Sequence, residues 1–348
     1  MPEPFLVIDA LTKRFGKVPA LDGIDLALGK DELLVVLGPT GAGKTTLLRT
    51  IAGLEEPTSG TIRMNGADVA PLSPAERDVA LVFQNFSLYP DWSVRKNMEF
   101  PLRAPGRRTP EPAIKERIAW AAELLKIGHL LERRASRLSG GEMQRVAIGR
   151  AIVRRPRLFL MDEPLTNLDA KLREALRLEL VDLRRKLDTP MIYVTHDQAE
   201  ALSMGDRVVV LAEGRVLQTG TPEEIYKRPI SPAVARQVGQ PRINLLSVEK
   251  RNGMYTTLAG LPLIAARKEL NGAQRLILGV RPEDVSLEGG EHPASVELIE
   301  DMGPTKVAVV SWGGERVHAL LDKHAPQRPK DQVFPRIDPA RVVLWPTK

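Results

Sequence analysis

Short, wholly apolar runs alternate with segments of helical periodicity over the first two thirds of the chain. The runs lie between polar turns and are Leu33–Leu37, Val79–Phe83, Leu158–Met161 and Met191–Val194. Such runs are typical of strands that are buried on both faces of a parallel sheet. Two intervening segments carry apolar residues on one helical face, the first at Ile114, Ile118, Ala121 and Leu125 and the second within 175–183. This pattern predicts an α/β domain with a parallel sheet.

After about residue 236 the helical periodicity nearly vanishes, and short strand-like runs recur between Gly, Pro and Asn turns. These runs are Tyr255–Leu258, Arg275–Val280, Ala294–Glu300, Lys306–Val310, Val317–Leu321 and Arg341–Leu344. Regularly spaced short strands predict a small β-barrel. Pro229, Pro232 and Pro241 suggest a linker before it. We therefore expect two domains, 1–235 and 236–348, and an antiparallel strand pair, Phe5–Leu11 with Gly23–Leu28, near the start of the first.

Composition narrows the class of protein. The chain has 348 residues, 43% of them apolar and 27% charged, which suits two globular domains. Its net charge of +6 includes no dense basic block, so the excess is interpreted as solvated surface. The lack of cysteine excludes disulfides, zinc–thiolate clusters and thiol catalysis. The N-terminus does not resemble a secretion signal, and no apolar run approaches the ~20 residues needed to cross a bilayer. We expect a soluble, cytoplasmic protein that reaches any membrane through partners.

The most specific chemical motif lies between the run Leu33–Leu37 and the helix-like stretch Thr46–Leu54. It is the G-x-x-x-x-G-K-T sequence Gly38-Pro39-Thr40-Gly41-Ala42-Gly43-Lys44-Thr45. Glycines let the backbone N–H groups curl around a phosphate, and the helix N-terminus adds its dipole. Lys44 would reach the β- and γ-phosphates, and the Thr45 hydroxyl would bind Mg²⁺. A chance glycine-rich turn is the alternative, but both flanks have the required context.

Two acidic residues follow the run Leu158–Met161. Asp162 would hold Mg²⁺ through water, and Glu163 would polarise the attacking water as a general base. The alternative is that the pair simply opens the next helix, with Pro164 in its first turn. The neighbouring phosphate loop favours the chemical interpretation.

Two other strand ends carry polar groups. His196 follows Met191–Val194 and would contact a γ-phosphate, although it would also suit a loop beside a helix cap. Gln84 follows Val79–Phe83 and would sense Mg²⁺ or water, although an isolated Gln is usually a polar turn. In an open parallel sheet ligands bind beyond the carboxyl ends of the strands. The convergence of these groups at one edge therefore predicts a single magnesium-nucleotide site.

A further motif, Leu138-Ser139-Gly140-Gly141-Glu142-Met143-Gln144-Arg145, has two interpretations. As structure, Ser139 is a helix N-cap and Glu142 completes its capping box. As chemistry, Ser-Gly-Gly leaves free N–H groups at a positive helix end, which is a second anion site. The spacing does not identify whose phosphate that site would hold.

Taken together, these motifs resemble those of ATP-binding-cassette ATPases, in the family's order, from about Phe5 to Tyr226. The resemblance implies an α/β P-loop NTPase fold with a helical subdomain at about 86–155. It assigns catalysis to Lys44, Gln84, Glu163 and His196, and Mg²⁺ binding to Thr45, Gln84 and Asp162. It assigns nucleotide binding to Phe15, Gly38, Pro39, Thr40, Gly41, Ala42, Gly43, Lys44, Thr45 and Thr46. Phe15 would stack on adenine, unless it is only an apolar residue at a hairpin.

The same resemblance implies a dimer that encloses two ATP molecules between two cassettes. The signature residues would grip the nucleotide of the other subunit, and they are Leu138, Ser139, Gly140, Gly141 and Glu142. The loop Asn167-Leu168-Asp169 would cross the dimer interface. The chain departs from the commonest family pattern at Glu142-Met143, where Gln-Gln is typical. The effect of the added negative charge near the γ-phosphate stays open.

A narrower resemblance covers both domains. The segments Phe83–Pro90, Glu163–Arg173, Gly239–Asn244 and Gly279–Asp284 are similar to those of carbohydrate importers of the maltose-importer ATPase type. It implies an oligonucleotide-fold-like regulatory domain at the C-terminus and an ATPase that powers import of a sugar, polyol or glycerol 3-phosphate. The implied partners are a second ATPase subunit, identical or paralogous, two transmembrane permease subunits and, indirectly, a solute-binding protein. The implied location is peripheral, on the cytoplasmic face of the inner membrane.

An alternative function is a cassette ATPase that acts on nucleic acid or ribosomes through its C-terminal barrel. Such barrels bind nucleic acid with stacked aromatics and a basic groove. Here the barrel region offers only Tyr255, Trp312, Phe334 and Trp345, without basic residues alternating among them. We therefore expect no nucleic-acid partner. An exporter motor is disfavoured by the C-terminal domain, and the sequence names neither the cargo nor a regulator.

Overall fold

The structure is a computed structural model that describes residues 3–104, 109–266 and 275–347. The chain forms two compact units, Met1–Pro222 and Glu223–Lys348. Each unit has its own buried hydrophobic core, which is the arrangement expected of separate domains.

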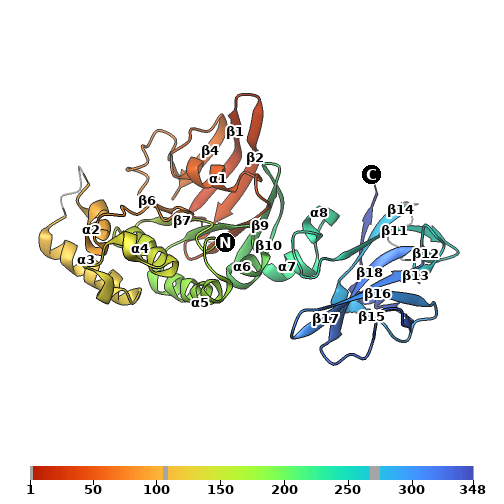
Figure 1. The fold of residues 1–348 in the computed structure, drawn as a ribbon. Helices are drawn as coiled ribbons and strands as arrows, with labels where there is room; N and C mark the ends of the chain where they lie inside the picture. Colours follow the sequence, from red (N-terminus) through yellow and green to blue (C-terminus); the bar gives the residue numbers. More distant parts are fainter. Residues whose placement is uncertain (1–2, 105–108, 267–274, 348) are drawn as a thin grey trace. The chain divides into compact units, whose positions relative to one another are not determined.

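A six-stranded sheet in the order β10–β9–β3–β8–β7–β6 forms the centre of the first unit. Its strands are parallel except β10 at the edge (Figure 1). Their bounds are β3 (Leu33–Leu37), β6 (Val79–Val82), β7 (Leu158–Asp162), β8 (Met191–Thr195), β9 (Arg207–Ala212) and β10 (Arg215–Gly220). Every residue of β3, β7 and β8 is buried, which confirms that the apolar runs are interior strands.

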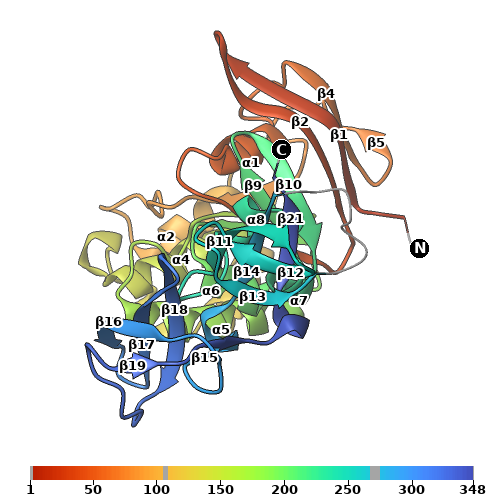
Figure 2. The ribbon, with the colours of Figure 1, turned by 90° about the vertical axis from the view of Figure 1, so that its right-hand side faces the viewer.

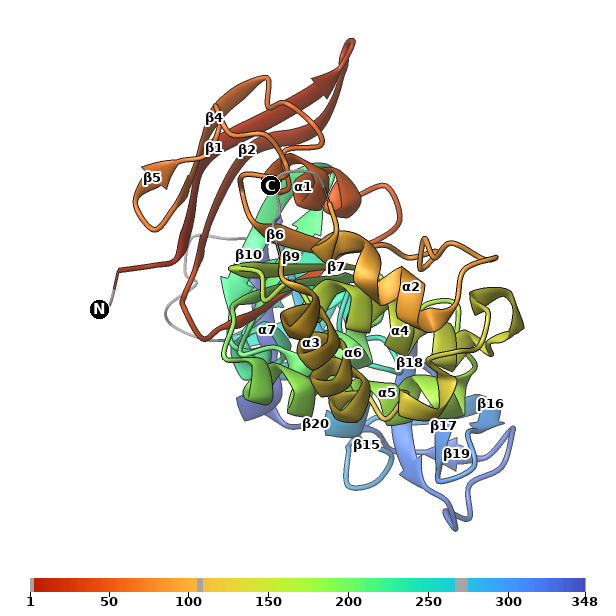
Figure 3. The ribbon, with the colours of Figure 1, turned by 90° about the vertical axis from the view of Figure 1, so that its left-hand side faces the viewer.

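A second, antiparallel sheet in the order β2–β1–β4–β5 lies next to helix α1 (Lys44–Ile51), as Figure 3 shows. Its strands are β1 (Leu6–Phe15), β2 (Val18–Leu28), β4 (Ser59–Met64) and β5 (Ala67–Asp68). The expected N-terminal strand pair is confirmed, but both strands extend further, to a tight turn at Gly16 and Lys17. Irregular register along β1 accommodates the polar residues that separate its apolar positions.

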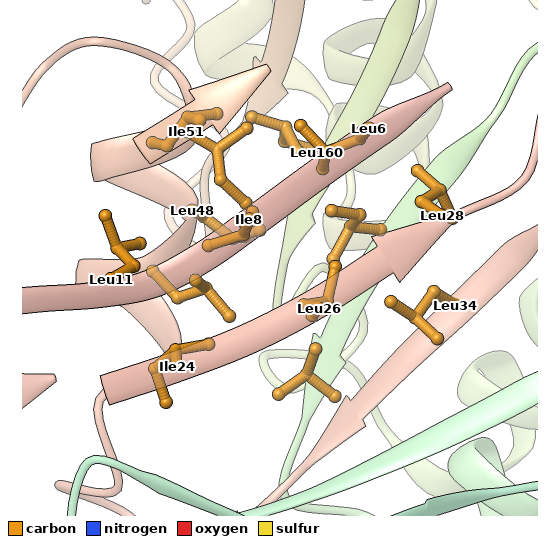
Figure 4. Close-up of a cluster of buried hydrophobic side chains, with 14 of the residues drawn as sticks. Leu6, Ile8, Leu11, Ile24, Leu26, Leu28, Leu34, Leu48, Ile51 and Leu160 are labelled. Atoms are coloured by element: carbon orange, nitrogen blue, oxygen red, sulfur yellow. The ribbon is translucent and has the colours of Figure 1, made fainter. Parts of the chain in front are cut away.

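The core of the first unit lies between the two sheets and α1. Buried leucines and isoleucines of β1 and β2 face the central sheet and the helix in Figure 4, where the labelled residues are Leu6, Ile8, Leu11, Ile24, Leu26, Leu28, Leu34, Leu48, Ile51 and Leu160. Burial of a side chain of this size stabilises the fold by about 1.5–3 kcal/mol. The packing anchors β3 and α1, and therefore the loop between them, from both sides.

Helices α2 (Val94–Glu99), α3 (Glu111–Leu124) and α4 (Gly140–Ile152) pack together in the yellow part of the ribbon, within the span expected for a helical subdomain (Figure 1). The remaining long helix of the first unit is α5 (Ala170–Leu187), followed by α6 (Gln198–Met204). In the parts of the chain that the structure describes, no helix has the length and apolarity to cross a membrane.

The second unit contains two main antiparallel sheets, β13–β12–β11–β14–β21 and β18–β17–β16–β19, with a short β15–β20 pair (Figure 2). Their inner faces share one hydrophobic core, as the predicted β-barrel-like domain requires. The strands are β11 (Asn244–Arg251), β12 (Met254–Thr257), β13 (Pro262–Ala265), β14 (Arg275–Val280), β15 (Val285–Ser286), β16 (Ala294–Asp301), β17 (Thr305–Trp312), β18 (Glu315–Asp322), β19 (Gln332–Val333), β20 (Arg336–Ile337) and β21 (Val343–Pro346).

The boundary between the compact units lies earlier than the expected position at 235. Most of helix α7 (Pro222–Lys227) and all of α8 (Pro232–Ala235) belong to the second unit. The indole N–H of Trp345 donates to the Pro229 carbonyl at 3.0 Å, and Ala235 packs in a buried cluster with this Trp. The segment expected to be a linker is thus held by the β domain, because its apolar residues and backbone carbonyls find partners there.

Candidate nucleotide-binding site

The loop between β3 and α1 is shaped by two glycines. Gly43, the N-cap of α1, has a φ of 104°, and a Cβ there would lie 2.4 Å from the Ala20 carbonyl oxygen. A Cβ on Gly38 would lie 2.3 Å from the carbonyl oxygen of Leu211. Only glycine fits at these positions without moving backbone. The loop is therefore held close to neighbouring strands, with α1 beginning at Lys44.

A pocket of about 420 Å³ lies over this loop. Its lining brings the loop together with the ends of β6, β7 and β8, and consists of Ala20, Thr40, Gly41, Gly43, Lys44, Thr45, Thr46, Gln84, Glu163, Thr166 and His196. The expected convergence of Gln84, Glu163 and His196 on the phosphate loop is thus present in the structure. Strand order β3–β8–β7–β6 explains it, because parallel strands place their carboxyl ends at one edge.

Lys44 is at the centre of the polar contacts in this pocket. Its ammonium donates to the carbonyl oxygens of Gly38 and Pro39, at 2.9 and 3.0 Å. It also lies 3.0 Å from Oε1 of Glu163, and only 5% of the side chain is exposed. A buried ammonium needs such partners, since desolvation without them is costly. The same ammonium is well placed to exchange these oxygens for those of a phosphate.

Glu163 is held by groups on both of its carboxylate oxygens. While Lys44 pairs with Oε1, the Thr166 hydroxyl donates to Oε2 at 3.2 Å and Nδ1 of His196 lies 2.8 Å from Oε2. Its backbone has a φ of +44°, a conformation that non-glycine residues seldom adopt. Burial acts to raise the pKa of Glu163, but Lys44 and His196 outweigh it and lower the pKa. The carboxylate is therefore kept ionised, as a proton acceptor must be.

Asp162 and Thr45 form the oxygen-rich side of the site. The Thr45 hydroxyl donates to Oδ1 of Asp162 at 3.0 Å, although these residues are far apart in the sequence. Burial raises the pKa of Asp162, and the charge of Glu163 acts in the same direction while the Thr45 hydrogen bond opposes it. A cation would relieve this desolvated charge. Carboxylate and hydroxyl oxygens suit Mg²⁺, which in nucleotide sites takes its remaining ligands from phosphates and water. Accordingly, no cluster of three or more His, Cys, Asp or Glu side chains in the described residues could hold a metal by itself.

A buried carboxylate that no sequence motif marks, Glu200, holds the end of β8 that precedes His196. Glu200 on α6 is 3% exposed and accepts hydrogen bonds from Tyr193, at 2.8 Å, and from Thr195, at 2.6 Å. Burial raises the pKa of Glu200, and the charge of Asp197 adds to this effect. These bonds fix the end of β8 just before His196. Glu200 stands between Ala199 and Ala201, and no local pattern singles it out. Thr166 lies within the segment Glu163–Arg173, but only the structure shows its contact with Glu163.

The loop Asn167–Asp169 is connected to the strand end at Gln84. The Asn167 amide donates to the Gln84 carbonyl at 3.0 Å, and the Asp169 carboxylate caps α5 by accepting from the N–H of Leu172 at 3.0 Å. Leu168 is buried, so the middle of the loop points inward. Phe15 is half exposed at the end of β1 and does not line the pocket.

The Leu138–Glu142 motif forms the start of α4 as a reciprocal capping box. The Glu142 backbone N–H donates to the Ser139 hydroxyl oxygen at 3.4 Å, and the Ser139 backbone N–H donates to Oε2 of Glu142 at 2.7 Å. The structural interpretation of this motif is therefore confirmed. All of Leu138–Glu142 is described, and none of it lines the 420 Å³ pocket. An anion bound here would thus be separate from one bound at Lys44 in the same chain.

Comparison with known proteins agrees with this geometry. The ABC transporter family pattern matches residues 21–166, and the TOBE domain pattern matches residues 278–345. The chain is 46% identical to the sn-glycerol-3-phosphate import ATP-binding protein UgpC of Bordetella avium, over 89% of this chain and 83% of that protein. It is 44% identical to UgpC 3 of Rhizobium etli, over 96% and 95% of the two chains.

Among solved structures, the first unit resembles cbiO1 from Clostridium perfringens, part of the ABC transporter complex cbiONQ. The TM-score is 0.59 at 29% sequence identity, over 64% of this chain and 90% of that one. Relatives of this similarity span both the cassette and the C-terminal domain. The chain therefore belongs to the ATP-binding subunits of ABC transporters and is an ATPase that drives transport.

Proposed function

We propose that the 420 Å³ pocket hydrolyses magnesium-bound ATP with Glu163 as the general base. The observation that supports this most directly is the contact chain Lys44–Glu163–His196, which combines a phosphate-binding ammonium, an ionised carboxylate and a histidine within hydrogen-bond distance. ATP phosphates would occupy the loop N–H groups at the start of α1. Lys44 would then leave Oε1 of Glu163 for the β- and γ-phosphate oxygens.

In the chemical step, the freed Glu163 carboxylate accepts a proton from a water whose oxygen attacks the γ-phosphorus. The bond from that phosphorus to the β-phosphate oxygen breaks, and the electron pair leaves with ADP. Thr166 and His196 hold Oε2 of Glu163 and so restrict its orientation. Thr45 and Asp162, with Gln84 nearby, are the residues that would bind Mg²⁺, which neutralises the phosphate charge.

We further infer that two cassettes close around two ATP molecules. The start of α4, with Ser139, Gly140 and Gly141, would contact the γ-phosphate held by the partner, and Asn167–Asp169 would lie at the interface. In support, the signature residues lie outside the ATP pocket of their own chain. A phosphate at the positive end of α4 would therefore have to come from a nucleotide bound elsewhere. A Cβ on Gly141 would lie 2.7 Å from the Leu172 side-chain terminus, so a larger residue here would require that leucine to shift.

The segment that follows Gln84 is suited to contact a permease. Tyr89 stacks on Trp92 with ring centroids 4.2 Å apart, and Phe100 packs edge-on against Tyr89. Tyr89 and Phe100 remain 39% and 46% exposed. Exposed aromatic residues that are fixed in place favour binding to another protein, since they lose little conformational entropy. The buried Asn97 amide anchors the segment through both the N–H and the carbonyl of Tyr89.

We propose that the transported solute is a sugar, polyol or glycerol 3-phosphate and that transport is inward. Relatives that are 44–46% identical to the chain are named as sn-glycerol-3-phosphate import ATP-binding proteins, and they share the C-terminal domain. The chain would then lie on the cytoplasmic face of the inner membrane, bound to two permease subunits and to a second ATPase, and would act with a solute-binding protein. The names of these relatives do not support the alternative function on nucleic acid or ribosomes.

The proposal is tested by tagging the full-length Glu163→Gln variant and recovering it from gently solubilised host membranes with ATP present. Mass spectrometry should identify two permease subunits with the chain, and the permease type identifies the solute class. A parallel Lys44→Ala variant should not bind ATP. It serves as the control, because a second ATPase subunit that pairs only through ATP should be missing from its preparation. Recovery of ribosomal or DNA-repair proteins without a membrane protein would contradict the importer function.

A further inference from the structure

The Glu142 carboxylate accepts hydrogen bonds from both donors of Ser139. Its Oε2 accepts both from the Ser139 backbone N–H, at 2.7 Å, and from the Ser139 hydroxyl, at 2.9 Å. Both groups lie at the start of α4, where the partial positive charge of the helix attracts anions. A carboxylate of this chain therefore already sits where a phosphate would be bound.

Arg133 offers the same carboxylate a second partner. Its guanidinium Nη1 lies 3.6 Å from Oε1 of Glu142, on the side away from the oxygen that Ser139 contacts. Both side chains are partly exposed, at 50% and 29%, so the carboxylate has room to move between them. The hydrogen bonds to Ser139 and the charge of Arg133 both help to lower the pKa of Glu142, which keeps the group ionised.

We propose that Glu142 competes with the γ-phosphate of the second cassette for Ser139 and so sets the ATP concentration at which two cassettes close. The inference rests on the proposed function, in which Ser139 contacts the ATP bound by a second copy of this chain. When that phosphate arrives, the Ser139 hydroxyl and N–H exchange the carboxylate for a phosphate oxygen, and Glu142 turns to Arg133. Two anions near one helix end repel, and this repulsion opposes closure.

The charge can be removed without removing the helix cap. Glutamine completes the same capping box as glutamate, because its side-chain oxygen also accepts from the N-cap residue. Glu142→Gln should therefore keep α4 intact and its thermal midpoint close to that of the parent protein. Arg133→Met removes only the alternative partner, since the backbone carbonyl of Arg133 continues to accept from the Val94 N–H.

The experiment is an ATP titration of self-association by the full-length chain, followed by analytical ultracentrifugation, with Glu163→Gln present throughout to prevent hydrolysis. Glu142→Gln should lower the half-saturating ATP concentration by about tenfold, from the Coulomb energy of nearby charges. Arg133→Met should raise that concentration. At about 1 M salt the difference between Glu142→Gln and the parent should shrink, because ions screen exposed charges.

An unchanged or higher ATP requirement in Glu142→Gln would overturn the competition, as would a difference that high salt leaves intact. Ser139→Ala distinguishes this failure from failure of the proposed function. If Ser139→Ala abolishes ATP-driven association while Glu142→Gln has no effect, the signature contact stands and only the role of Glu142 is wrong. If Ser139→Ala associates like the parent, the proposed contact with the second copy is itself wrong.

Discussion

The Lys44 ammonium lies 3.0 Å from Oε1 of Glu163, and both side chains are largely buried. The phosphate-binding cation and the proposed general base are therefore each other's counter-ion. ATP phosphates compete for the same cation, so their arrival would release the carboxylate at the moment when a base is needed. This coupling follows from the position of two charges in a site with little water.

The ion pair should contribute to stability in a pH-dependent way. Because the pKa of Glu163 is lowered in the folded chain, its contribution is present above the ordinary value of 4.5 and is lost as pH falls through the folded pKa. Glu163→Gln should reduce the free energy of unfolding of the first unit by about 1–3 kcal/mol at pH 7. Denaturation at several pH values should show the two proteins converging as pH falls below 4.5 and through the lowered pKa of Glu163. A difference independent of pH would contradict the assignment.

Catalysis should depend far more on Glu163 than on Thr166, the neutral residue that donates a hydrogen bond to it. Glu163→Gln should lower turnover by about 10²–10⁴-fold and leave ATP binding intact, because a general base contributes that much. Thr166→Val is nearly isosteric and removes only one hydrogen bond to Oε2 of Glu163. It should lower turnover by about tenfold or less, in line with one lost hydrogen bond. Steady-state hydrolysis together with fluorescent-nucleotide binding separates the two effects, and normal turnover in Glu163→Gln would refute the mechanism.

Glu200 should stabilise the end of β8 through hydrogen bonds rather than charge. Glu200→Ala leaves the buried hydroxyls of Tyr193 and Thr195 without their acceptor and should cost about 1–3 kcal/mol. Glu200→Gln keeps an acceptor oxygen and removes the cost of burying a charge. Since burial raises the pKa of Glu200, the stability advantage of Gln should appear as pH rises above 4.5. Thermal midpoints of both variants at pH 5 and 8 test this; a Gln variant as unstable as Ala would exclude it.

Arg150 should matter for coupling but not for hydrolysis. Its guanidinium donates to the carbonyls of Ser87 and Phe86, the latter at 2.8 Å, where both residues have positive φ. Arg150→Met should loosen the segment after Gln84 that carries Tyr89 and Trp92, and so reduce transport by the assembled complex. ATP hydrolysis by the isolated chain should stay within about twofold of normal. A conservative Arg150→Lys control keeps the positive charge and a donor group but not the fork of two guanidinium nitrogens that contacts both carbonyls. Equal transport by all three proteins would show that this anchoring does not serve the permease.

Much of the fold was predictable because its signals are local. Buried parallel strands are apolar throughout, so β3, β7 and β8 could be identified within a residue of their observed ends. In the second unit, β11 and β13 were not predicted. The alternation of buried Leu246 and Val248 along β11 is a genuine strand signal, but two alternate positions beside polar residues are weak evidence before pairing partners are known.

The sequence by itself determined the chemistry of the site. A phosphate loop needs glycines, a lysine and a hydroxyl at fixed local spacing, and a capping box needs Ser and Glu three residues apart. These requirements act within one turn or loop, so residues 38–45 and 139–142 display them directly.

Tertiary structure alone decided which groups touch. Thr45 reaches Asp162, and Glu163 pairs with Lys44 and His196, only because β8 lies between β3 and β7 in the sheet. Strand order depends on the packing of a common core and on crossover connections, which no local pattern encodes. The retention of α8 by the β domain has the same origin. It depends on Trp345, a partner distant in sequence, whose contacts outweigh local preference.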